Sequence, residues 1–369
     1  MALTRIQPPA LEDVREPNFR NIIINGDMAV SQRATSAASV ATQQYPAVDR
    51  FQFGLAGTMG TWTFSQDTDV PTGQGFANSF KMDCTTADAS PAAADAIRIA
   101  QIIEGQNLQY LKKGTSSAVP LTLSFWVKSV LTGTYIAELY DVDNTRQVSK
   151  SYTISSASTW EYKTITFPAD TTGAFTNDNN ASLYLNFFVG AGTDYTSGSL
   201  NTSWAAVTNA NRAVGQVNLA NSTSNNFWIT GIQMEAGSVA TDFEVNTFAQ
   251  NLERCRRYAL VLGDAPGGAA YDTFFKGVIG HYYNATDFYP NFNFPIVMRS
   301  VPGTTFSTAS SGFGTVYSNG SGRANTSNGT NATYETNINF RVSTASATAG
   351  DGGAFDFAAS NYVILSAEL

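Results

Sequence analysis

The chain has 369 residues, which is long enough for two domains with separate cores. Hydrophobic residues make up 43% of it, which excludes disorder throughout, while charged residues make up only 14%, well below the roughly 25% usual in soluble domains. The formal net charge is −8 and lysine and arginine are not clustered, so nucleic acid and anionic lipid are excluded as expected partners. No apolar run reaches the roughly 20 residues that span a bilayer, so membrane insertion is not expected either.

Residues 1–20 differ in character from the sequence that follows. Pro8, Pro9 and Pro17 interrupt regular structure, so this segment is either a docking peptide or a loosely ordered terminus. It lacks the continuous apolar segment of a secretory signal, and we therefore expect synthesis and folding in a cytosol.

Residues 21–245 contain many short strands. Segments such as RFQFGL, GTWTFSQD and WEYKTITFPA alternate between apolar and polar residues, and Gly, Asn and Asp turns separate them. This pattern predicts an antiparallel β-sandwich, most simply a jelly roll. The polar stretch 192–226 interrupts the series, and a loop of that length usually serves function or an interface.

The stretch 226–258 changes its period from 2 to 3.6. Residues 226–236 alternate as a strand, whereas residues 246–262 repeat at helical spacing, which predicts a short helix that links two domains. The apolar stripe of this helix consists of Phe248, Leu252 and Cys255. Such a small stripe is not stable alone, so it must pack on the chain's own sheet or on the same helix of other copies.

Residues 263–369 are predicted to form a second β-sandwich. GDAPGGAA at its start reads as a hinge, and the low-complexity stretch NGSGRANTSNGTNATYET reads as long hairpin loops. The segment NYVILSAEL reads as a strand that belongs to a sheet. The sequence thus predicts a mainly β protein with two antiparallel sandwiches joined by a helix.

Residues suited to catalysis are few. The single histidine, His281, has no nucleophile elbow to accompany it, and it reads as a strand residue. The acidic pairs in QDTD and YDVDN read as turns, because Asp and Asn side chains bond to their own backbone. Cys84 and Cys255 are predicted to be buried free thiols, and one histidine with two distant cysteines cannot supply a zinc site. We therefore expect no enzyme activity, no catalytic residues, no metal and no cofactor.

Glycan binding is the better ligand hypothesis. Neutral sugars are held by stacking on exposed aromatic rings and by hydrogen bonds from polar side chains. Three tryptophans are flanked by polar residues and are candidate glycan contacts, with ordinary packing as the alternative: Trp62, Trp160 and Trp204. Trp126 and Trp228 lie within apolar strands and are predicted to be core residues.

Four segments of the chain resemble virion appendage proteins of tailed bacteriophages. The first is NIIINGDMAVSQR with YPAVDRF, and the second is FWITGIQMEAGSVATDFE with the later CRRY. FPIVMRSVP and the terminal SAEL are the third and fourth, the latter with Ser366 where the family often has Asp. These segments occur in the family's order and lie in both halves of the chain.

The resemblance implies a structural phage protein, most often a tail fibre, whose first β-domain looks like a carbohydrate-binding module. It implies a homotrimer, with Phe248, Leu252 and Cys255 as candidate trimer contacts, and residues 1–20 as the peptide that docks on other virion proteins. The expected role is host attachment through a cell-surface glycan or protein, in a virion made in the host cytoplasm. A purely architectural head, neck or tail decoration protein is the main alternative, and a glycan-degrading tailspike is a further one.

Overall fold

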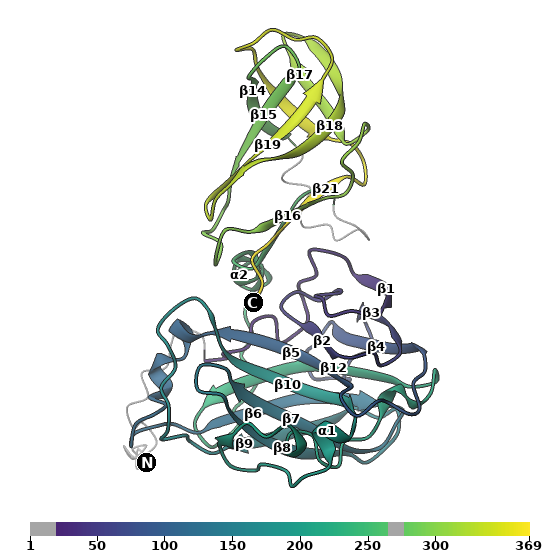
Figure 1. Cartoon of the computed structure of the whole chain (residues 1–369), viewed down its shortest axis with the longest axis vertical. Helices are drawn as coiled ribbons and strands as arrows, with labels where there is room; N and C mark the ends of the chain where they lie inside the picture. The colour runs from purple at the N-terminus through teal and green to yellow at the C-terminus, as the bar shows by residue number, and fades with distance from the viewer. Residues whose placement is uncertain (1–19, 265–276) are drawn as a thin grey trace, which may run out of the picture.

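The computed structural model describes residues 20–264 and 277–369. It confirms the mainly β class, because antiparallel strands form two six-stranded sheets, a three-stranded sheet and a closed six-stranded barrel. Figure 1 shows the barrel at one end of the elongated molecule and the two larger sheets at the other, with helix α2 between them. No helix in the two described ranges is long and apolar enough to cross a bilayer. Of the peptide predicted at residues 1–20, only Arg20 falls among the described residues.

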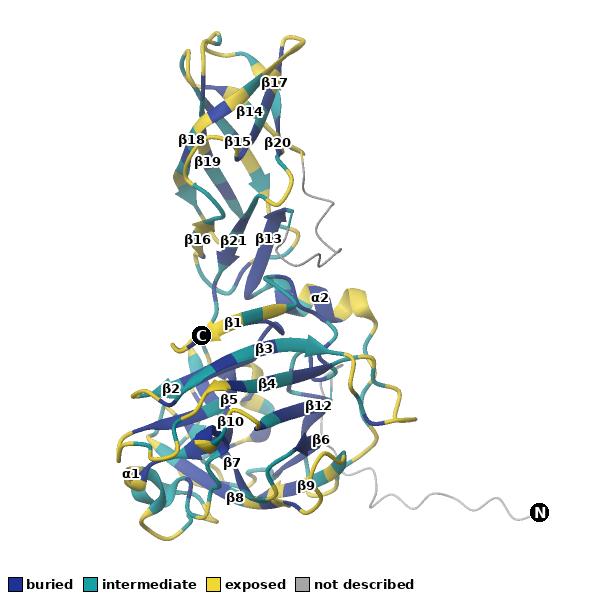
Figure 2. Cartoon of the chain, turned by 90° about the vertical axis from the view of Figure 1, so that its right-hand side faces the viewer, coloured by how far each residue is buried: buried dark blue, intermediate teal, exposed yellow. Residues whose placement is uncertain are grey.

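The two larger sheets form a sandwich. The sheet that we call the β12 sheet has the order β1 (Ser36–Val40), β3 (Thr61–Asp67), β4 (Ser79–Thr86), β12 (Asn226–Ala236), β6 (Leu121–Ser129) and β9 (Glu161–Phe167). Figure 2 looks onto this sheet. The sheet that we call the β10 sheet has the order β11 (Ala205–Ala206), β8 (Arg146–Ile154), β7 (Gly133–Asp141), β10 (Ala181–Ala191), β5 (Ala96–Glu104) and β2 (Gln52–Ala56). The short helical elements here are η2 (Gly105–Asn107), η3 (Gln109–Leu111), α1 (Thr193–Thr196), η4 (Asn209–Asn211) and η5 (Leu219–Asn221).

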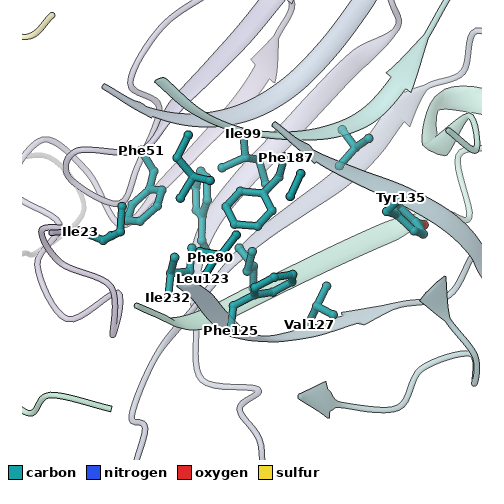
Figure 3. Close-up of a cluster of buried hydrophobic side chains, with 14 of the residues drawn as sticks. Ile23, Phe51, Phe80, Ile99, Leu123, Phe125, Val127, Tyr135, Phe187 and Ile232 are labelled. Carbon is teal, nitrogen blue, oxygen red and sulfur yellow. The ribbon is translucent and has the colours of Figure 1, made fainter. Parts of the chain in front are cut away.

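The core of the sandwich lies between these sheets, where alternate residues of each strand point inward. Figure 3 shows part of this core. Phe125 of β6 and Phe187 of β10 meet edge to face with ring centroids 5.0 Å apart, which joins the two sheets. On β4 and β3, Phe80 and Phe64 stack at 5.4 Å. The alternation seen in the sequence therefore sets which face of each strand is buried.

The second half of the chain departs from the expected sandwich. Its strands β14 (Gly277–Tyr282), β15 (Asp287–Asn293), β19 (Asn337–Thr344), β18 (Ser321–Thr333), β17 (Gly314–Ser318) and β20 (Gly352–Phe357) close into a barrel. Phe313, Phe340, Phe355 and Phe357 fill it with mutual ring contacts of 5.0 to 6.4 Å. Closure leaves no unpaired edge, and the inward rings share one core with aliphatic residues such as Val278, Val316 and Ile338.

The low-complexity stretch is also different from the prediction. Residues 321–333 form the long strand β18 rather than hairpin loops, since they pair with β17 on one side and β19 on the other. The Gly, Asn and Ser residues of this segment have low strand propensity, but hydrogen bonding to a strand on each side outweighs it.

A three-stranded sheet connects the barrel to the sandwich. It has the order β13 (Ala259–Gly263), β21 (Tyr362–Ser366) and β16 (Gly303–Phe306). The strand expected near the C-terminus is therefore confirmed. The hinge predicted after Gly263 lies mostly outside the described residues.

Helix α2 is shorter than predicted, running from Phe248 to Arg256 rather than over residues 246–262. Thr247 and Gln250 form a capping box that fixes its start. Its end is set by β13, because the apolar residues from Ala259 pair with β21 instead of continuing the helix.

The apolar stripe of α2 packs on the chain itself. Leu252 and Cys255 are buried against Val30 and Ile24 of the segment before β1. The prediction of these two residues as trimer contacts is therefore wrong, since their side chains are already covered by their own chain. Phe248 is 43% exposed, and its role in a trimer stays a prediction. Cys84 and Cys255 are both free and buried, as predicted.

Most segments that carry the family resemblance meet at the junction of sandwich and three-stranded sheet. Glu368 binds Arg33 with an Oε1–Nη2 distance of 2.9 Å and also pairs with Arg50. Gln32 donates to the backbone oxygen of Ala259 at 2.8 Å. Arg299 donates to the backbone oxygen of Asn179 at 3.0 Å. These residues therefore act as structural connectors between the two halves of the chain.

The segment 233–244, which precedes α2 and also carries the resemblance, has a structural role as well. Glu235 accepts hydrogen bonds from the backbone nitrogen and hydroxyl of Thr241 at 2.9 and 2.8 Å. Gln233 accepts one from the backbone nitrogen of Glu244 at 2.7 Å. These bonds fold residues 237–244 back against the end of β12, and this placement matters for the site described next.

Candidate functional site

A groove of about 550 Å³ lies on the outer face of the β12 sheet. Its floor comes from β6, β9 and β12, and its walls come from three loops. The lining residues are Asp27, Gln74, Gly75, Phe76, Ser124, Trp126, Tyr162, Gly231, Asp242, Phe243 and Val245. Four aromatic rings and three acidic or amide side chains thus share one hollow.

Trp126 and Tyr162 form the aromatic floor. They are opposite each other on β6 and β9, and their ring centroids are 5.3 Å apart with planes inclined at 47°. Phe125 and Val127 point into the core, so alternation turns Trp126 to the outer face. Tyr162 is 46% exposed. The pair offers aromatic surface on which the C–H face of a sugar ring can pack.

Phe76 and Phe243 form one wall. Their rings meet edge to face at 5.1 Å. Phe76 lies against Gly231, which has φ +61 at an irregular point of β12, and a Cβ there would come within 2.6 Å of the Phe76 ring. Glycine is therefore required both by the backbone conformation and by the approach of this ring.

Apart from Ser124, the polar side chains of the groove are acids or amides. Asp27 accepts a hydrogen bond from the Asn251 side chain at 2.9 Å, and burial raises the pKa of its carboxyl above the ordinary value. Asp242 and Gln74 are exposed at the rim. Carboxylates accept hydrogen bonds from hydroxyl groups, and amides both accept from them and donate to them. Together with flat aromatic rings, these groups provide the contacts that sugar recognition needs.

A second aromatic row lies next to the groove on the same sheet. Trp228 of β12 is stacked between two lysines, with Lys128 Nζ 4.2 Å and Lys81 Nζ 5.3 Å from its ring centroid. Trp160 donates from its indole nitrogen to Asp69 at 3.0 Å, and Asp69 also pairs with Lys128. This row is held by its own cation–π and ionic contacts.

The three predicted glycan contacts do not lie in the groove. Trp62 is wrong as a ligand platform, because it is fully buried in the core and donates to the backbone of Met59 at 2.9 Å. Trp204 packs against the sandwich core and donates to the backbone of Pro168 at 2.8 Å. Trp160 is partly exposed in the neighbouring row, so its role as a ligand contact stays a prediction.

The outward position of Trp126 has a signal in the sequence. Trp126 is predicted as a core residue because it stands between the apolar residues Phe125 and Val127. Strict alternation within that strand, with Leu121, Leu123, Phe125 and Val127 inward, would have placed it outside. Trp228 also points outward, although neighbours cover it to 9% exposure.

The acidic residues considered for catalysis have structural partners. Asp141 is buried, pairs with Lys113 and accepts a backbone hydrogen bond from Asn144 at 3.1 Å, as a turn residue does. Asp67 accepts one from the backbone of Asp69 at 2.8 Å. His281 is an exposed residue of strand β14. Within residues 20–264 and 277–369, no three His, Cys, Asp or Glu side chains group as metal ligands.

No protein-family model matches the chain, and no curated protein matches it in sequence. Among solved structures it is similar to the enzymatically active domain of bacteriophage CBA120 tailspike protein 4, at 15% identity and TM-score 0.30, over 59% of this chain and 21% of that one. It is also similar to a family 11 carbohydrate-binding module of a Clostridium thermocellum cellulosomal cellulase, at 13% identity and TM-score 0.27, over 56% and 98% of the two chains. A family 30 carbohydrate-binding module matches at 10% identity and TM-score 0.30, over 64% and 97%. The description of the fold rests on the strand pairing given above.

Proposed function

We propose that this chain binds a neutral glycan in the groove of the β12 sheet. The observation that carries the proposal is the Trp126–Tyr162 pair, a partly exposed aromatic floor bordered by Asp27, Asp242 and Gln74. A sugar ring would stack on the floor through its C–H faces, and its hydroxyl groups would bond to the acidic and amide side chains.

The biological setting that we propose is a virion appendage of a tailed bacteriophage, with host attachment as its purpose. The support is the family resemblance of the four segments in the sequence. Single sugar contacts of this kind are weak, so a homotrimer with three grooves would gain avidity without new contacts. Residues 1–20 would join the trimer to other virion proteins.

The groove is tested with the full chain on an array of neutral and charged glycans. Trp126→Ala and Tyr162→Ala should each weaken binding by about tenfold, since each removes one stacking surface. Tyr334→Ala is the matched control, because Tyr334 is an aromatic residue of the barrel with 57% exposure. Unchanged binding by both groove variants would refute the proposed site.

The glycan-degrading alternative has one observation in its favour, namely the raised pKa of Asp27 in a groove that also contains Asp242. Incubation of the protein with a glycan that it binds separates the two functions. A rise in reducing ends that Asp27→Asn abolishes would establish hydrolysis. A glycan that is bound but not cleaved favours adhesion. A protein that binds no glycan on host cells but is required for particle assembly favours the architectural role.

A further inference from the structure

The outer face of the β10 sheet contains an arginine with no ionic partner. Arg98 of β5 lies between core residues Ile97 and Ile99, so its side chain points away from the core. It makes no hydrogen bond or ion pair with any residue in the described ranges, and its Nε atom is buried without a partner. A partly buried cation without a counter-ion is costly, and proteins keep one where something else supplies the negative charge.

The surroundings of Arg98 are cationic and aromatic. Arg212 lies close by and binds Glu138 through two nitrogens, at 2.7 and 2.9 Å. The Glu138 carboxylate attracts Arg98 electrostatically, but its hydrogen bonds go to Arg212 and Asn186. Burial and the neighbouring Arg212 lower the pKa of Arg98. The negative charge of a bound anion would counteract this lowering of the Arg98 pKa.

Three tyrosines frame the two arginines. Tyr140 and Tyr184 are partners on β7 and β10, and their rings meet at 5.8 Å. Tyr195 lies 5.7 Å from the Arg212 guanidinium. All three are partly exposed, so their rings and hydroxyl groups remain accessible beside the guanidinium groups.

Buried polar atoms on the same face also lack partners. Asn186 is 1% exposed and its Oδ1 has no hydrogen bond, while its Nδ2 donates to Glu138 at 2.9 Å. Ser149 is fully buried with an unpartnered hydroxyl, and it lies opposite Glu138 on the next strand. Buried polar atoms are rarely left unpaired, so this row has hydrogen-bonding capacity that the chain itself does not use.

Space for the Arg98 side chain comes from a glycine on the edge strand. Gly54 of β2 is opposite Arg98, and a Cβ at this position would lie 2.8 Å from Arg98 Cγ and 2.9 Å from Nε. The guanidinium therefore extends across the sheet edge over a residue without a side chain.

We propose that this face is a second glycan site, which takes a sugar acid whose carboxylate binds Arg98 and whose ring lies against Tyr184. A guanidinium matches a carboxylate through two parallel hydrogen bonds, and a pyranose ring fits beside a tyrosine ring. We call this the Arg98 site. It lies on the opposite sheet from the groove and does not depend on the function proposed for the groove.

The site is tested by calorimetric titration of the full chain with trigalacturonate, and with maltotriose and inorganic phosphate as comparison ligands. Trigalacturonate should bind, and Arg98→Met should weaken it by about tenfold or more, with Arg98→Lys in between. Arg341→Met, which removes an exposed cation of the barrel, and Trp126→Ala, which alters the groove, should leave this affinity unchanged. Phosphate that binds as tightly as trigalacturonate would overturn the assignment to a sugar acid, and equal binding by Arg98→Met would overturn the site.

Thermal unfolding of the same variants separates a binding role from a structural one. Because Arg98 has no partner to lose, Arg98→Met should keep or raise the melting temperature. A clear fall in melting temperature with unchanged affinity would assign Arg98 to the fold instead. Gly54→Ala provides an independent test, since its added methyl group must displace the guanidinium. It should weaken trigalacturonate binding at nearly the same melting temperature, and full affinity in this variant would contradict the proposal.

Discussion

The Arg257 guanidinium binds the Glu104 carboxylate through two nitrogens, at 2.8 and 2.7 Å, and joins the residue after α2 to the end of strand β5. The hydroxyl group of Tyr258 donates a hydrogen bond to the same carboxylate. Glu104 is completely buried, and the two partners lie 153 and 154 residues away in the chain. Burial alone would raise the pKa of Glu104, but the hydrogen bonds from Arg257 and Tyr258 outweigh it and lower the pKa.

Removal of this carboxylate should destabilise the junction. Glu104→Ala leaves Arg257 and Tyr258 without their acceptor, at an expected cost of about 3 kcal/mol in the free energy of unfolding. Urea unfolding followed by tryptophan fluorescence measures it. Glu253→Ala is the control, because it removes an exposed carboxylate from α2 near the same place. An equal loss in both variants would show that the buried pair has no special part in stability.

The same pair predicts a pH dependence of stability. The pKa of Glu104 is lower in the folded state than in the unfolded state, where it is about 4.3. Its ionised carboxylate therefore stabilises the fold at pH values above the unfolded pKa, and this stabilisation is lost as the pH falls through the folded pKa. The free energy of unfolding of the wild type should therefore fall below about pH 4.5. In Glu104→Gln this acid dependence should be smaller, and identical slopes for the two proteins would contradict the assignment.

Trp62 and Trp126 should respond in opposite ways to truncation. Trp62→Ala removes a fully buried ring from the core and should cost about 3 to 5 kcal/mol of stability. Trp126→Ala removes a partly exposed ring and should cost about 1 kcal/mol, while it weakens glycan binding. Chemical denaturation and the glycan array together test this contrast. A Trp126 variant that unfolds as readily as the Trp62 variant would place Trp126 in the core after all.

Gly231→Ala should damage the groove indirectly. The new Cβ meets the Phe76 ring and the residue must keep φ +61, so we expect about 1 to 2 kcal/mol of destabilisation and weaker glycan binding. Gly73→Ala is a useful comparison, because Gly73 also has positive φ but has open space around its Cβ position. Equal loss of glycan binding in both variants would mean that backbone strain, and not Phe76, is responsible.

The two thiols should be unreactive in the native protein. Burial raises the pKa of both Cys84 and Cys255, and only the thiolate reacts with an alkylating reagent. Iodoacetamide at neutral pH, read by mass spectrometry, should label neither cysteine until denaturant is added. Rapid labelling of Cys255 in the native protein would show that α2 detaches from Val30 and Ile24.

Local patterns in the sequence determined the class of fold and the position of many strands of the sandwich. Alternation fixes which residues of β6 face the core, and the Thr247–Gln250 pair fixes the start of α2. Such features depend on neighbours within a few residues, so they can be read from the chain alone.

Only the tertiary structure decided which distant segments meet. The end of α2 depends on β13 pairing with β21, about a hundred residues later, and strand β18 exists because two strands flank it in a closed barrel. The groove likewise needs Trp126, Phe76 and Phe243 from three separate segments. Local propensity does not determine these long-range contacts. They depend on which strand edges are still unpaired and which sheet faces are still uncovered once the sheets have formed.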